Sequence, residues 1–128
     1  MIKILVMGHG GYAKGVQSNL EMVVGLPDNF HFVDLEKNED LATFEKKVNN
    51  LVSEFKDDQI LFVCDLLGAS PFRVAALLTA NNSDRYCTLS GINMMAFMEL
   101  AMPSDESLEE IAARAVETTK ESVSKFPE

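Results

Sequence analysis

The first thirteen residues constrain the fold of this chain more than any other stretch. The apolar run from Ile2 to Met7 is too short for a helix and predicts a central parallel strand. The segment GHGGYA, from Gly8 to Ala13, follows directly, and a helical pattern starts at Tyr12. We therefore expect a strand that ends at Gly8, a glycine-rich turn that carries His9, and a helix behind it.

The same alternation of strand and helix continues through the chain. Further strands are predicted over Phe30–Val33, Ile60–Cys64 and Arg85–Leu89. Helices are predicted to start at Tyr12, Asn38, Ser70 (a hydroxyl cap before Pro71), Met94 and Ser107, the last with a capping box to Glu110. This order predicts one α/β domain over residues 1–128. Its expected architecture is a three-layer, doubly wound parallel sheet of four strands in the flavodoxin-like order 2-1-3-4.

That strand order brings two ionisable residues together. The switch point of the sheet lies between the first and third strands, and ligands bind at such points. His9 follows the first strand and Asp65 follows the third. Asp34, at the end of the second strand, is expected to be a turn residue. His31, inside that strand, is expected to lie at the surface or to be hydrogen-bonded.

The chemistry of this crevice follows from its residue types. A carboxylate beside an imidazole accepts one ring N–H, stabilises a positive ring and leaves the other nitrogen free as a nucleophile. Helix N-termini present backbone N–H groups that bind phosphate. The catalytic candidates are His9 and Asp65, and the phosphate-binding candidates are Gly10, Gly11, Gly68, Ala69 and Ser70. Together they indicate phosphoryl transfer through a phosphohistidine.

Several classes of function are disfavoured. No glycine-rich loop ends in Lys and Ser or Thr, and no cluster of Mg²⁺ ligands is evident, so we expect neither ATP as phosphate source nor any metal or cofactor. The net charge of -9 disfavours nucleic acid and anionic membranes as partners. No signal peptide or membrane-length apolar run is present, so we expect a cytoplasmic protein without direct membrane insertion. Cys64 and Cys87 lack metal-type spacing and are expected to be buried thiols.

Three segments carry a resemblance that covers essentially the whole chain. They are Gly8 to Gly15 (GHGGYAKG), Asp65 to Phe72 (DLLGASPF) and Gly91 to Glu99 (GINMMAFME). They resemble the mannose-family IIA component of the bacterial phosphoenolpyruvate-dependent sugar phosphotransferase system. The resemblance implies a phosphotransferase component of sugar uptake that takes phosphate from the phosphocarrier HPr, passes it to a IIB component and forms a homodimer.

The resemblance also implies roles for single residues. The phosphate would sit on Nε2 of His9, Asp65 would hold Nδ1, and Ser70 would help to hold the phosphoryl group. Ala69 stands where many relatives have a glycine, which implies a slightly stiffer loop. No strand is evident after the last helix, so we do not expect the exchange of a C-terminal strand that some relatives show.

Two other interpretations remain open at this point. Gly8 to Ala13 also fits the dinucleotide fingerprint G-x-G-x-x-A, with Asp34 near the place of its acidic residue. That fingerprint gives Asp65 no role, and 128 residues leave little room for a substrate domain. A non-catalytic regulatory module of the same fold is the third possibility, and it predicts a stable fold without phosphate uptake.

Overall fold

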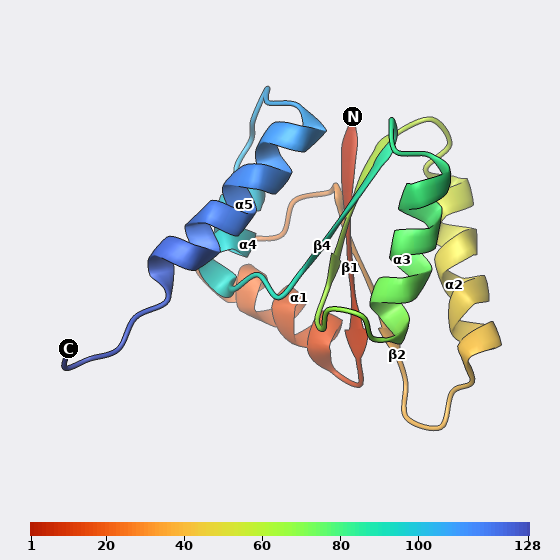
Figure 1. Cartoon of the computed structure of the whole chain (residues 1–128), viewed down its shortest axis with the longest axis horizontal. Coiled ribbons are helices and arrows are strands. Elements are labelled where there is room, and N and C mark those ends of the chain that lie inside the picture. The colour runs from red at the N-terminus through yellow and green to blue at the C-terminus, as the bar shows by residue number, and fades with distance from the viewer.

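The structure, a computed structural model, describes all 128 residues as one parallel sheet flanked by helices (Figure 1). The strands are β1 (Ile2–His9), β2 (Phe30–Leu35), β3 (Gln59–Cys64) and β4 (Tyr86–Ser90). The helices are α1 (Tyr12–Val23), α2 (Leu41–Glu54), α3 (Ser70–Asn81), α4 (Met94–Leu100) and α5 (Leu108–Ser122). The strand order is β2-β1-β3-β4 and every neighbouring pair is parallel, which confirms the predicted topology.

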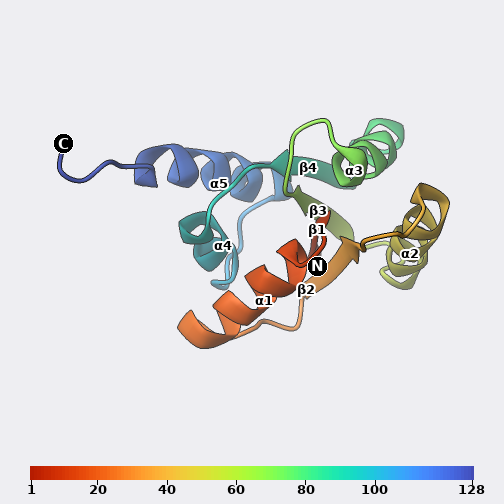
Figure 2. The ribbon, with the colours of Figure 1, turned by 90° about the horizontal axis from the view of Figure 1, so that it is seen from below.

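Helices cover both faces of the sheet, so the fold has three layers. In Figure 2, α1, α4 and α5 lie on one side of the strands, whereas α2 and α3 lie on the other. Residues of β1 alternate between two apolar cores: Ile4 and Val6 pack toward α1 and α5, and Leu5 and Met7 pack toward α2 and α3. Because β1 and β3 are covered on both faces, they appear in the sequence as continuous apolar runs.

Two strands run further than the sequence indicated, and both extensions matter for the site. His9 is the last residue of β1, where the sequence predicted a turn residue, and it is paired with Leu35 of β2. Asp34 lies within β2 and is only 6% exposed, so the expectation of a turn residue was wrong. Polar residues at the ends of strands lack the apolar signal by which strands are recognised, and this explains both differences.

The starts of α1, α4 and α5 are as predicted, whereas those of α2 and α3 differ by one or two residues from the sequence prediction. The cap of α2 is Asp40, whose side chain accepts the N–H of Thr43, and the predicted cap Asn38 has a positive φ of 70°. The cap position of α3 is Ala69, so Ser70 is the first helical residue and does not cap. The predicted capping box of Ser107 and Glu110 at the start of α5 is confirmed.

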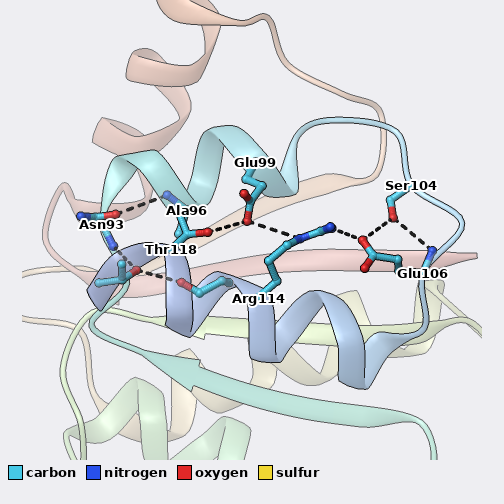
Figure 3. Close-up of polar contacts among 9 residues, drawn as sticks. Asn93, Ala96, Glu99, Ser104, Glu106, Arg114 and Thr118 are labelled. Atoms are coloured by element: carbon cyan, nitrogen blue, oxygen red, sulfur yellow. Dashed lines mark hydrogen bonds and ion pairs between the residues drawn. The ribbon is translucent and has the colours of Figure 1, made fainter. Parts of the chain in front are cut away.

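The segment from Gly91 to Glu99, the third of the segments that carry the family resemblance, has a structural role in this fold. Asn93 caps α4 by accepting the N–H of Ala96, and its amide also donates to Ser122 at 2.8 Å (Figure 3). Arg114 of α5 pairs with Glu99 at the end of α4 and with Glu106 in the following loop (Figure 3). These contacts fix α4 and its loop against α5. None of the five helices is long and apolar enough to cross a membrane.

His31 differs from its sequence expectation, because it is half-buried and incompletely hydrogen-bonded. Its ring packs against Phe55 with 4.6 Å between ring centroids, and Nε2 is buried without a partner. Burial lowers the pKa of His31, nearby Lys3 lowers it further, and Glu54 opposes both. The unfolded chain therefore binds this proton more readily than the folded chain does.

This pKa shift predicts a loss of stability in mild acid. As pH falls below the ordinary histidine pKa of 6.5, protonation of His31 favours the unfolded state. We expect the urea midpoint to fall between pH 7.5 and pH 5.5 by more in the wild type than in His31→Leu, which removes the titrating group. Equal falls in the two proteins would contradict this assignment.

Candidate functional site

His9 and Asp65 form a hydrogen-bonded pair at the carboxyl edge of the sheet. Oδ2 of Asp65 lies 2.7 Å from Nδ1 of His9 and accepts the backbone N–H of His9 at 2.9 Å. Oδ1 of Asp65 accepts the N–H of Leu66 at 2.8 Å. The His9 side chain is 41% exposed and the Asp65 side chain 11%. The carboxylate thus makes three polar contacts, whereas Nε2 of the exposed His9 ring has no hydrogen-bond partner in the protein.

The register of the two central strands explains this meeting. Met7 of β1 is paired with Cys64 of β3, and the N–H of Asp65 donates to the carbonyl of Met7. His9 and Asp65 therefore leave neighbouring strands at nearly the same level. Figure 1 shows the two strand ends at the lower edge of the sheet, beside the starts of α1 and α3. Residues 56 positions apart are adjacent because the crossover places β3 directly beside β1.

Two other ionisable groups near this pair stay protonated at neutral pH. The pKa of Tyr12 is raised to about 12, first by burial and then by the charges of Asp65 and other neighbours. Burial, followed by the charge of Asp65, raises the pKa of Cys64 to about 12. Neither residue was a sequence candidate for the site. Because both remain neutral, His9 is the accessible nucleophile of this cluster.

The start of α3 offers free backbone donors beside the pair. The N–H groups of Gly68, Ser70 and Phe72 have no acceptor within the protein. Ser70 and Phe72 lie in the first turn of α3, where Pro71 has no N–H, and Gly68 lies just before the cap position. Phe72 was not a candidate from the sequence, although the donors of a first helical turn can be counted from the position of Ser70. The N–H of Ala69, a phosphate-binding candidate, is instead bonded to the carbonyl of Leu66.

The glycine-rich turn after β1 offers fewer free donors than the sequence indicated. The N–H of Gly10 donates to the carbonyl of Leu35 at 2.9 Å, whereas that of Gly11 has no acceptor in the protein. Gly10 has a φ of 61°, a left-handed conformation that glycine adopts without strain. The first turn of α1 is capped by a carboxylate from another strand: Asp34 accepts the N–H of Ala13 at 2.8 Å and that of Lys14 at 3.2 Å.

The surroundings of the pair are apolar and exposed on one side. Leu66 and Leu67, which follow Asp65 directly, are 58% and 78% exposed. A cavity of about 730 Å³ lies elsewhere, at the amino edge of the sheet between Ile2, Leu100 and Arg114. The chain has no group of three or more His, Cys, Asp or Glu residues placed to hold a metal ion. The His9–Asp65 pair is thus an open surface site that a second protein can reach.

Comparisons with known proteins point to one family. The "PTS system mannose-specific EIIAB component" of Escherichia coli K12 is 30% identical over 125 residues, which are 95% of this chain and 38% of that protein. This chain therefore spans well under half the length of that relative. The crystal structure of "phosphotransferase system component EIIA" from Streptococcus agalactiae matches with a TM-score of 0.88, 26% identity and 98% coverage of each chain.

A second solved structure gives the same result. The "PTS IIA protein associated with the fucose utilization operon" from Streptococcus pneumoniae has a TM-score of 0.82 and 32% identity, over 97% of this chain and 92% of that one. The sequence model of the EIIA-man family, described as "PTS system fructose IIA component", matches residues 3–116. With its sheet order, its His9–Asp65 pair and these matches, the chain belongs to the EIIA-man family of phosphotransferase-system components.

Proposed function

We propose that this chain is a single EIIA domain over residues 1–128 that carries a phosphoryl group on His9 from HPr to a IIB component during sugar uptake. The observation that carries the proposal is the contact of 2.7 Å between Asp65 and Nδ1 of His9, which leaves Nε2 free on an exposed ring. Membership of the EIIA-man family supports the same role. The cytoplasm is the proposed place of action and a homodimer the proposed assembly, as the resemblance implies.

The proposed transfer step conserves bonds and charge between the phosphohistidine of HPr and His9. The donor is the phosphohistidine of HPr, protonated on its second ring nitrogen. Its N–P bond breaks, the electron pair returns to the donor ring, and a new N–P bond forms to Nε2 of His9. The positive charge thereby moves from the donor ring to the ring of His9, whose Nδ1–H points to Asp65. Asp65 stabilises that charge, and the N–H groups of Gly11, Gly68, Ser70 and Phe72 are the proposed donors to the phosphoryl oxygens.

The exposed leucines give the proposed docking face its apolar part. Leu66 and Leu67 lie next to the reactive pair in the chain, so a phosphocarrier can cover them while it approaches His9. Coverage would exclude water from the phosphoryl group during transfer. The acidic net charge of -9 suits a basic partner surface.

The dinucleotide interpretation has little support from this geometry. A dinucleotide places its pyrophosphate on the N–H groups at the start of the first helix. In this chain Asp34 already accepts the N–H groups of Ala13 and Lys14, and Gly10 donates to Leu35. A buried carboxylate at that position repels a pyrophosphate.

Phosphate uptake measured by intact-mass spectrometry tests the proposal. Mixed with phosphoenolpyruvate, the general phosphotransferase enzyme and HPr, the wild type should gain one acid-labile, base-stable phosphoryl group. His9→Ala should gain none, because it lacks the nucleophile. His31→Leu is the matched control, since His31 is the only other histidine, and it should gain one group. Addition of a IIB component should then remove the group. No gain in the wild type, or an equal gain in His9→Ala, would refute the proposal.

A further inference from the structure

The first turns of α1 and α3 flank the same strand ends but differ in one respect. At α3 the N–H groups of Ser70 and Phe72 are open. At α1 the N–H groups of Ala13 and Lys14 are both taken by the carboxylate of Asp34, whereas those of Gly11 and Tyr12 have no acceptor in the protein. A helix N-terminus attracts anions through its free N–H groups and its dipole. The turn that follows His9 thus leads into a helix end at which a carboxylate already accepts two of the N–H groups.

Asp34 is the one charged side chain in the buried part of the protein, at 6% exposure. Its backbone partner in β1 is Gly8, the residue before His9. Lys47 of α2 donates to the backbone carbonyl of Asp34 at 3.0 Å, so the residue is held from both faces of the sheet. Its charge reaches the site, because it contributes to the raised pKa of Tyr12 together with Asp65. Burying a carboxylate is costly unless hydrogen bonds compensate it, so this position has a specific structural requirement.

We infer that Asp34 is a positioning residue that occupies two first-turn N–H groups of α1, so that these two groups do not hold a phosphoryl group on His9 and the phosphoryl group leaves readily. The inference rests on the proposed transfer at His9. A phosphocarrier must release its group as easily as it accepts it. Two further open donors at the start of α1 would stabilise the phosphorylated form and hinder transfer to the next protein. The carboxylate of Asp34 removes that stabilisation.

The equilibrium between phospho-HPr and this protein tests the inference. Asp34→Asn and Asp34→Ser each remove the charge, and serine keeps a side chain that caps helices. The phosphorylated fraction at equilibrium gives the equilibrium constant for transfer from phospho-HPr to this protein. In both variants we expect this constant to be about two- to fivefold larger than in the wild type, the usual range for one helix-end charge. Asp28→Asn is the matched control: it removes one charge from the loop before β2, at the opposite edge of the sheet, and should leave the constant unchanged.

The direction of the change separates this role from a merely structural one. A disturbed turn would lower the phosphorylation of His9, whereas loss of the Asp34 charge should raise it. An unchanged or smaller constant in both variants would overturn the inference. If the wild type took up no phosphate, the proposed function itself would fail, so the two failures are distinguishable.

Amide spectra of the wild type give a second test that needs no variant. On phosphorylation, the ¹H–¹⁵N signals of Ser70 and Phe72 should shift strongly, because their open N–H groups gain phosphoryl oxygens as acceptors. Those of Ala13 and Lys14 should shift little, because they stay bonded to Asp34. Shifts of equal size at the two helix ends would overturn the inference.

Discussion

Replacing Asp65 by alanine should slow phosphoryl transfer to His9 by about 10²- to 10³-fold, the usual loss when one preorganised electrostatic partner is removed. The Asp65 carboxylate accepts from both Nδ1 and the backbone N–H of His9. Without it, the ring loses its fixed orientation and the positive charge formed during attack has no counter-charge. Rapid-quench measurement of phosphate uptake from phospho-HPr gives the rate.

The control for Asp65→Ala is Asp84→Ala. Asp84 is exposed and precedes β4, at the opposite edge of the sheet, so its removal changes the net charge equally without touching the pair. We expect the Asp84 variant to transfer at the wild-type rate. Circular dichroism should show that Asp65→Ala remains folded. A folded Asp65→Ala protein with an unchanged transfer rate would remove Asp65 from the mechanism.

The topology and the central pair could be predicted because their signals are local and strong. Apolar runs such as Ile60–Cys64 identify buried strands, and the crossover rule then fixes their order. The strand order alone places His9 beside Asp65, and the structure has them 2.7 Å apart. The exact bounds of the helices and strands were not needed for this inference, because the carboxyl ends of neighbouring parallel strands always lie at the same edge of the sheet.

The details of hydrogen bonding could not be predicted in the same way. Asp34 appears in the sequence as an ordinary acidic residue after an apolar run, and nothing local shows that it caps a helix 20 residues away. The assignment of Ser70 as a cap failed because Ala69 and Ser70 are both compatible with the following proline. Which N–H groups remain without an acceptor depends on contacts between segments that are distant in the sequence. Those contacts are seen only in the three-dimensional structure.

The packing of Tyr12 on Gly8 is another feature that only the structure reveals, and it makes Gly8→Ala a damaging substitution near the end of β1. A Cβ atom at Gly8 would lie 2.4 Å from Cδ2 and 2.7 Å from Cβ of Tyr12. The Cβ atom of Tyr12 cannot move without its helix, so the substitution must displace the start of α1. We expect a loss of about 1–3 kcal/mol in the free energy of unfolding, as for other overpacked sites. Urea denaturation measures it.

Gly11→Ala is the matched control, because no atom lies within 4 Å of a Cβ at Gly11 and its φ of -102° suits any residue. Its stability should stay within about 0.5 kcal/mol of the wild type, as for most surface substitutions. If the clash with Tyr12 causes the loss, adding Tyr12→Gly to Gly8→Ala should cost less than Tyr12→Gly costs alone, because glycine removes every Tyr12 atom that the new Cβ meets. Strictly additive losses would show that Gly8 is required for another reason than the close approach of Tyr12.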